Sequence, residues 1–244
     1  MKKFWMALQF LTILPVKVPG SFAGKDLNFL LAWFPVAGAV MGLLPAVIVV
    51  AGGVLPQMAL VAVALTAYTV LTGALHIDGF ADTCDGIFSG RTKEQMLEIM
   101  RDSRIGTYGA AGVGLLLLLK FAFLLGLPQM MLWKMFILIP MFARWIQSLA
   151  CAGTRYARTT GKAALFFQYA TVWDVVLGGI FCLAVIFALL GMKGLCVFGA
   201  ALLPAVLFIR FIEQKLGGMT GDTVGAASEI AELSGLFFGL VFLL

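Results

Sequence analysis

The chain has 244 residues, of which 62% are hydrophobic and only 12% are charged, and its mean hydropathy is +1.05. A soluble domain carries about 25% charged residues, so this composition excludes an ordinary soluble protein. The net charge of +5 is spread over short segments between apolar runs, which argues against a nucleic-acid-binding face. The short alternating segments of a membrane β-barrel are not seen. We therefore expect an all-α, polytopic integral membrane protein.

The N-terminal segment differs from the apolar runs that follow it. Residues 1–16 carry two lysines and a short apolar stretch that is interrupted by Pro15 and Lys17, without a small-residue cleavage site. We expect an interfacial helix there, or half a span. About seven longer runs follow, each close to the 20 residues needed to cross roughly 30 Å of hydrocarbon. The predicted spans are 28–52, 56–75, 108–127, 129–150, 173–191, 194–212 and 225–244.

The connections between these spans are strongly asymmetric. Three of them, 76–107, 151–172 and 213–224, are long and carry nearly all the loop charge, and alternation of the spans places them on one side. All but three of the 17 Lys and Arg residues lie on that side, including those near the N-terminus; the exceptions are Lys120, Lys134 and Lys193. The positive-inside rule places this side in the cytoplasm. The sequence therefore predicts a single transmembrane domain, residues 1–244, whose active site faces the cytoplasm.

An acidic cluster follows the second predicted span. Asp78, Asp82 and Asp85 are spaced i, i+4 and i+7, so their carboxylates project from one face if the span continues as a helix. Three like charges at this spacing repel one another, and hard cations such as Mg²⁺ prefer carboxylate oxygens and substrate phosphates. The spacing therefore indicates a metal site. His76, the sole histidine, precedes the cluster and is a candidate base or phosphate hydrogen-bond donor, against a structural role.

The same connection contains a group suited to anions. Arg101 and Arg104 flank Asp102, with Arg91 upstream, and guanidinium groups match phosphate oxygens in a bidentate manner. Ser103 and the amides of the glycine-rich stretch 106–109 add donors at the start of the next span, where the helix dipole favours negative charge. The alternative is that the arginines only anchor the protein at the membrane surface.

Polar residues of the later segments complete the candidate site. Arg144, Arg155 and Arg158 form a possible basic rim for a phosphorylated substrate, or serve as topology anchors. Thr220 and Asp222 lie in a glycine-rich loop and are candidate partners for the phosphates. Glu229 and Glu232 fall inside an apolar run, where carboxylates are costly and are treated as functional by default; Glu229 is a candidate metal ligand, and interhelical hydrogen bonding is the alternative.

Several of the segments described above resemble the sequence motifs of the cobalamin synthase family, the adenosylcobinamide-GDP ribazoletransferases. The resemblance is carried by 76–86 (HIDGFADTCDG), 100–109 (MRDSRIGTYG) and 220–226 (TGDTVGA), and by the shorter strings 10–15 and 33–38. It covers essentially the whole chain.

The resemblance implies transfer of the adenosylcobinamide phosphoryl group from adenosylcobinamide-GDP to α-ribazole or its 5′-phosphate, with release of GMP and with Mg²⁺ as cofactor. It also implies the cytoplasmic (inner) membrane of a prokaryote, contact with membrane lipid, and no nucleic-acid partner; a homo-oligomer and contacts with other late corrinoid-pathway enzymes stay open. By the resemblance and by their chemistry, Asp78, Asp82, Asp85 and Asp102 are expected to bind metal or diphosphate and to take part in catalysis, and Arg101 and Arg104 to hold phosphates. The residue patterns described above add Glu229 as a candidate metal ligand, His76 as a candidate catalytic residue, and Arg91, Ser103, Arg155, Thr220 and Asp222 as candidates for substrate binding.

Two other classes of protein share some of these features. A CDP-alcohol phosphotransferase or a prenyl transferase also uses aspartates and a divalent cation, but Arg91 comes too late after Asp82-Thr-Cys-Asp-Gly86 for the Ala-Arg step of the former. A divalent-cation transporter would need polar groups along a path through the membrane, whereas these carboxylates gather on one side.

Overall fold

The structure, a computed structural model, describes residues 1–19 and 24–244. These residues form helices, and the bridge between Tyr156 and Met219 is the isolated β-pairing among them. The helical elements are α1 (Lys2–Leu11), η1 (Gly24–Leu27), η2 (Leu31–Trp33), α2 (Phe34–Met41), α3 (Leu43–Ala51), α4 (Gln57–Leu71), α5 (Leu75–Phe88), α6 (Lys93–Ile99), α7 (Thr107–Gly126), α8 (Gln129–Gly153), α9 (Ala164–Tyr169), α10 (Val172–Leu216) and α11 (Gly221–Leu243).

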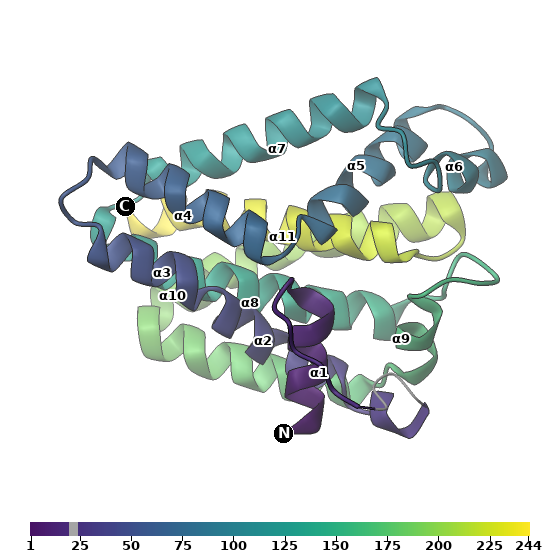
Figure 1. The fold of residues 1–244 in the computed structure, drawn as a ribbon, viewed down its shortest axis with the longest axis horizontal. Coiled ribbons are helices and arrows are strands. Elements are labelled where there is room, and N and C mark those ends of the chain that lie inside the picture. The colour runs from purple at the N-terminus through teal and green to yellow at the C-terminus, as the bar shows by residue number, and fades with distance from the viewer. Residues whose placement is uncertain (20–23) are drawn as a thin grey trace.

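The long helices lie side by side along the longest axis of the molecule, with α11 between α5, α8 and α10 (Figure 1). In its most apolar stretch, 78% of α8 is buried inside the protein, compared with 17% for α10. Helix α8 is therefore a central helix, while α10 exposes an apolar surface suited to lipid. The expectation of an all-helical, polytopic membrane protein is confirmed.

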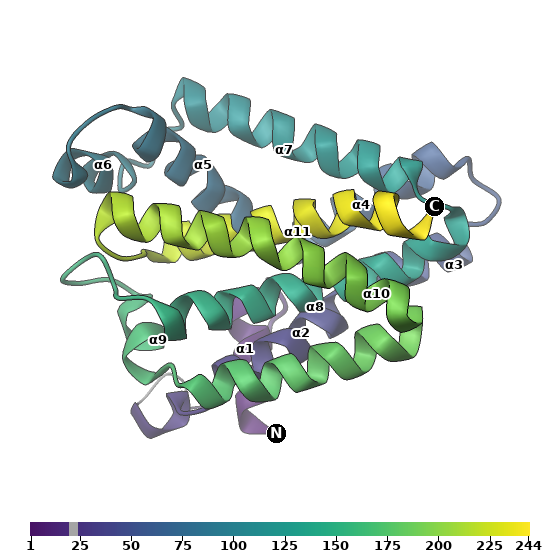
Figure 2. The same cartoon turned by 180° about the vertical axis from the view of Figure 1, so that it is seen from behind.

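Five helical stretches among the described residues are long and apolar enough to cross a membrane, or six if α4 and α5 together make one bent span. One of the five, α10, has 45 residues and would be about 68 Å long if straight, roughly twice the hydrocarbon thickness. It is interrupted at Gly191, whose φ of 61° and ψ of −148° are not helical, and the ribbon doubles back there (Figure 2). The two halves correspond to the separate spans 173–191 and 194–212 that the sequence predicts.

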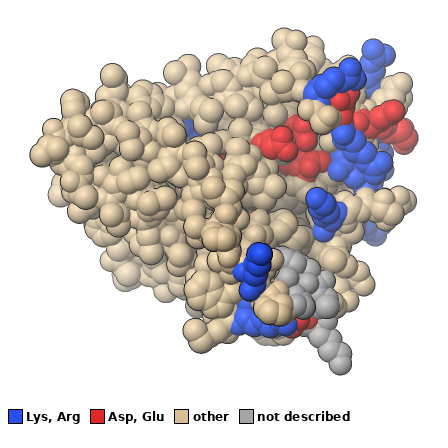
Figure 3. Space-filling view, in the orientation of Figure 1, with Lys and Arg blue, Asp and Glu red and all other residues tan. Residues whose placement is uncertain are grey.

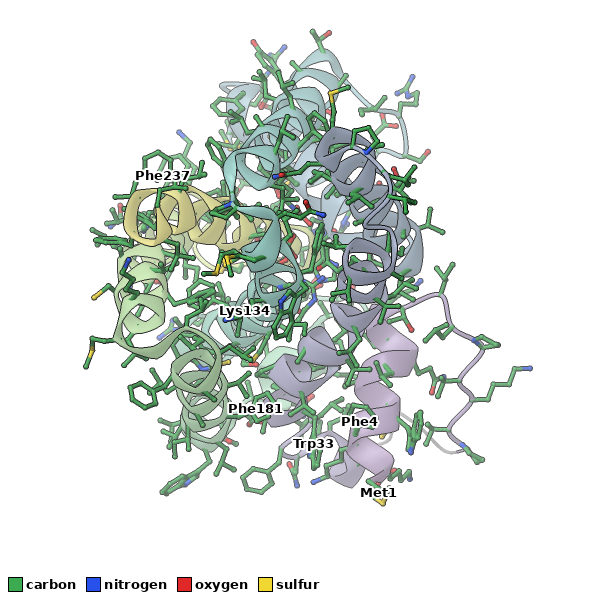
Figure 4. The ribbon with its side chains drawn as sticks, turned by 90° about the vertical axis from the view of Figure 1, so that its left-hand side faces the viewer. Met1, Phe4, Trp33, Lys134, Phe181 and Phe237 are labelled. Atoms are coloured by element: carbon green, nitrogen blue, oxygen red, sulfur yellow. The ribbon has the colours of Figure 1, made fainter. Side chains whose placement is uncertain are left out.

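Helix α1 runs across the long helices rather than along them (Figure 1). One face is buried through Met6, Ala7 and Leu11. The centroid of the Phe4 ring lies 6.1 Å from that of the Trp33 ring, and Figure 4 shows these two residues near each other at the end of the bundle. Its transverse direction and single buried face agree with the expectation of an interfacial helix.

Most of the charged side chains visible in Figure 3 gather at one end of the molecule, where α6, α9 and the C-terminal half of α5 lie. The other end, which holds the α3–α4 and α7–α8 turns, shows mostly uncharged residues in this view. The three long connections thus meet at one end of the bundle, as their charge asymmetry predicts.

Candidate active site

The acidic helix α5 is not a continuation of α4. Gly73 and Ala74 have φ values of 59° and 54°, and two successive left-handed residues end a right-handed helix. Helix α5 therefore departs at 85° from α4. The supposition that the second predicted span continues as one straight helix into the acidic cluster is therefore wrong. Helix α5 is nevertheless helical through Asp78, Asp82 and Asp85, so these residues keep their i, i+4, i+7 spacing on one face.

A fourth carboxylate comes from the other end of the chain. The carboxylate of Asp222, in the first turn of α11, is an electrostatic neighbour of Asp82, together with those of Asp78 and Asp85. The approach depends on Gly79, because a Cβ atom at this position would lie 2.7 Å from the carbonyl oxygen of Asp222. Asp78 is exposed, whereas Asp82 and Asp222 are half-buried.

Arg158 holds the Asp222 carboxylate. The backbone of Met219 pairs with Arg155 and Ala157, with N–O distances of 2.8 Å on both sides, and this pairing brings the next residues of the loop to the start of α11. The Nη1 atom of Arg158 then lies 3.0 Å from Oδ2 of Asp222. The sequence suggests both Arg155 and Arg158 as part of a basic rim. Arg155, the one predicted to bind substrate, is exposed, whereas Arg158 is the arginine that pairs with Asp222.

Asp85 has a different environment from the other aspartates. Its two carboxylate oxygens accept hydrogen bonds from the backbone N–H groups of Gly106 (2.7 Å) and Gly109 (2.8 Å). These donors are the N-cap residue and the third residue of α7, at the helix N-terminus that the sequence suggests for a substrate phosphate. The anion at this helix N-terminus is therefore the Asp85 side chain itself, which joins α5 to α7.

Replacing Asp85 by alanine should lower the free energy of unfolding by about 1–2 kcal/mol, because two N–H groups of α7 lose their acceptor. The measurement is thermal unfolding of the purified protein in detergent. Asp78→Ala is the matched control, since Asp78 is exposed on the same helix and should leave the unfolding temperature nearly unchanged. An Asp85→Ala protein as stable as the control would contradict a capping role.

The loop that follows α6 places its arginines at the surface. Arg91, Arg101 and Asp102 line an open hollow of about 550 Å³, and Ser103 is exposed. Arg104 binds both oxygens of Asp102, with an Nη2–Oδ2 distance of 2.6 Å, and this pairing lowers the pKa of Asp102 to about 2. Asp102 therefore stays ionised at neutral pH and is already paired with a cation, whereas Arg91 and Arg101 border space wide enough for phosphate groups.

Thr220 acts as the N-cap of α11. Its hydroxyl oxygen accepts from the N–H of Thr223 at 3.2 Å and lies 3.3 Å from the Asp222 carboxylate. The side chain is fully buried. Thr220 thus positions Asp222 at the start of the helix rather than presenting a free hydroxyl.

Glu229 lies away from the aspartates, seven residues or about 10 Å farther along α11 than Asp222. It pairs with Lys120 of α7, whose Nζ also lies 2.6 Å from Glu232. Arg144 of α8 donates to Glu232 at 3.4 Å and to the Tyr68 hydroxyl at 3.0 Å. These five buried side chains, which we call the buried ion-pair network, connect α4, α7, α8 and α11; the structure does not bring Glu229 together with the predicted metal site.

A cavity of about 330 Å³ adjoins the acidic site. Its lining includes the charged side chains of Asp78, Asp222, Arg158 and Lys162, the polar side chains of His76 and Gln147, and several apolar and aromatic side chains. Tyr156 also borders the cavity, and burial raises the pKa of its hydroxyl, so it remains a neutral hydrogen-bonding group. The sequence pattern does not single out Lys162 or Tyr156, because they lie with Arg155, Arg158 and Gly161 in a basic loop whose charge is already explained by membrane topology.

The donor chemistry of this site suits a magnesium ion shared with a substrate. In the described part of the chain, no three His, Cys, Asp or Glu side chains are grouped so as to hold a metal by themselves. Mg²⁺ is commonly bound by one or two carboxylates together with substrate phosphates and waters. The neighbouring carboxylates of Asp78, Asp82 and Asp222 fit this mode, since their mutual repulsion favours a cation between them.

Comparisons of the sequence with known proteins all point to one family. The profile of the family described as cobalamin-5-phosphate synthase matches residues 3–241. A protein of Clostridium novyi (strain NT), named adenosylcobinamide-GDP ribazoletransferase, is 37% identical over 96% of this chain and 94% of its own length. A protein with the same name from Acetivibrio thermocellus is 36% identical over 100% of this chain and 98% of its own length. Another from Roseiflexus sp. is 38% identical over 94% of this chain and 86% of its own length. No solved structure matches.

Proposed function

The chain belongs to the cobalamin-5-phosphate synthase family, and from this premise we infer that it is the membrane transferase that completes cobalamin. It joins the adenosylcobinamide phosphoryl group of adenosylcobinamide-GDP to α-ribazole or α-ribazole 5′-phosphate, and GMP is released. The observation that supports placing this reaction at the charged end is the meeting of α5 and α11. It brings the charges of Asp78, Asp82 and Asp222 close together, with Asp78, Asp222 and Arg158 lining one cavity.

The reaction exchanges one phosphorus–oxygen bond for another. A ribose hydroxyl of the ribazole attacks the phosphorus that carries the corrinoid, and the bond from this phosphorus to the GMP oxygen breaks, with the electron pair leaving on GMP. The hydroxyl proton passes to a carboxylate of the cluster. Arg91 and Arg101 hold the diphosphate of the donor in the open hollow that they line.

We propose that Asp78, Asp82 and Asp222 hold Mg²⁺ when the diphosphate is bound. The ion would offset the charge that builds up on the phosphoryl oxygens. The protein contributes the position of the carboxylates, which is fixed by the packing of Gly79 on α11 and by the Arg158–Asp222 pair. We also propose that this end of the molecule faces the cytoplasm of a prokaryote, since the Lys and Arg residues favour that side.

The direct test uses the purified full-length protein in lipid nanodiscs. With Mg²⁺, adenosylcobinamide-GDP and α-ribazole, it should yield adenosylcobalamin and an equal amount of GMP, and removal of divalent cations with EDTA should stop the reaction reversibly. Absence of product together with Mg²⁺ uptake by protein-containing vesicles would instead support a transporter.

Replacing Gly79 by alanine should reduce turnover by about 10²-fold, because the new methyl group forces α5 and α11 apart and displaces Asp82 relative to Asp222. The rate of GMP release measures this effect. Gly114→Ala is the matched control: Gly114 is also in a helix, but a Cβ atom there has no neighbour within 4 Å. Equal rates for the two variants would show that the close approach of the helices is not needed.

A further inference from the structure

The 330 Å³ cavity has features that the phosphate chemistry does not use. The side chains of Phe10, Phe34, Phe166 and Phe167 form an aromatic wall. The rings of Phe10 and Phe34 are stacked with centroids 6.0 Å apart, and those of Phe10 and Phe166 are 4.6 Å apart. An aromatic wall of this kind stacks against a flat, apolar ring and gives no advantage to a phosphate.

His76 lines this cavity and carries an unmatched polar atom. The side chain is 4% exposed, and its Nδ1 atom has no hydrogen-bond partner among the residues that the structure describes. Buried polar atoms of this kind are costly unless a partner is supplied. His76 is also a lining residue of the cavity, which brings a ligand bound there next to its imidazole ring.

We propose that this cavity binds the aromatic base of the acceptor nucleoside, with Nδ1 of His76 hydrogen-bonded to the base. The proposal rests on the function proposed above and assigns one of its two substrates to a place. A ribazole base is a flat, fused bicyclic ring with one unprotonated ring nitrogen, so a single hydrogen bond satisfies its polar atom. His76 is a binding residue in this assignment.

Size excludes the corrinoid of the other substrate from the same place. A volume of about 330 Å³ lies at the lower end of small-molecule pockets, roughly 300–1,000 Å³, and is too small for a corrinoid macrocycle. The charged lining residues Asp78, Arg158, Lys162 and Asp222 can also pair with the donors and acceptors of a guanine base, so competition by guanosine is the outcome that separates the two bases.

The assignment also orients the reaction. Asp78 and Asp222 line the same cavity as the aromatic wall, so a nucleoside with its base among the phenylalanines has its ribose next to the carboxylates. The attacking hydroxyl is thereby held beside the proposed metal and phosphate site.

Steady-state kinetics on the full chain in nanodiscs, with both substrates varied, test the assignment. His76→Phe keeps the aromatic shape but removes the nitrogen, and should raise the KM for α-ribazole about 10-fold, the effect of one lost hydrogen bond, without changing the KM for adenosylcobinamide-GDP. Ala163→Phe, which narrows the cavity, should have the same selectivity. Ala184→Phe, on the exposed face of α10, is the matched control and should behave as wild type.

A second measurement uses the wild-type protein and needs no variant to fold. The probe 1-methylbenzimidazole, a base without ribose, should inhibit competitively against α-ribazole, and guanosine should not. Competition by guanosine against α-ribazole, or an unchanged KM for α-ribazole in both cavity variants, would overturn the assignment. A wild-type protein that forms no cobalamin would instead refute the proposed function, so the two failures are distinguishable.

Discussion

Replacing Asp82 by asparagine is expected to lower kcat by about 10²–10³-fold while the protein still folds in the membrane. The Asp82 carboxylate interacts electrostatically with the carboxylates of Asp78, Asp85 and Asp222. It therefore lies at the centre of the negative charge of the proposed metal site. Asparagine preserves the size of the side chain but removes the negative charge. The rate of GMP release at saturating substrates, measured over a range of Mg²⁺ concentrations, reports the effect.

Glu94→Gln is the matched control for this prediction. Glu94 lies on the exposed surface of α6 at the same end of the molecule, so it loses the same charge without touching the cluster. It should retain the wild-type rate and the wild-type Mg²⁺ dependence. An Asp82→Asn enzyme with wild-type turnover would remove Asp82 from the site.

Replacing Lys120 by methionine should destabilise the protein by about 3–5 kcal/mol, the usual result of removing one partner from a buried charge pair. Lys120 is 2% exposed and pairs with both Glu229 and Glu232, and no water is available inside a membrane to solvate the carboxylates that it leaves behind. Thermal unfolding in one detergent measures the loss. Lys193→Met, which removes an exposed lysine, should change the unfolding temperature little.

The double variant Lys120→Met/Glu229→Gln separates charge balance from packing. It removes one positive and one negative charge, and Arg144, Glu232 and Tyr68 can still pair with one another. We expect it to recover part of the stability lost in Lys120→Met. A double variant less stable than the single one would show that the methionine, and not the unpaired carboxylates, causes the defect.

Asp85 and Glu229 show what residue type and spacing cannot predict about a carboxylate. Asp85 lies within the string 76–86 and Glu229 lies three residues after the string 220–226, and the sequence predicts a metal-binding role for both. In the structure, the Asp85 oxygens accept from the backbone of α7, and Glu229 pairs with Lys120 within the bundle. Their partners lie 21 or more positions away in the chain, so no local pattern reveals that these carboxylates are already satisfied.

The sequence by itself determined the class of the protein, the ends of most spans and the side on which the charges gather. These properties follow from local hydropathy and from counting charges, because each apolar run must satisfy its own backbone in the bilayer. It also located Asp78 and Asp82 and, through the strings around them, the family.

Only the tertiary structure decided which residues meet. The 85° turn at Gly73 and Ala74 re-aims α5, the Met219 pairing brings Arg158 to Asp222, and the packing of α1, α2, α8 and α9 around α5 and α11 encloses the cavity beside His76. Each of these depends on contacts between segments far apart in the chain. The geometry of these contacts is set by side-chain packing between distant segments, and local sequence patterns contain no information about such packing.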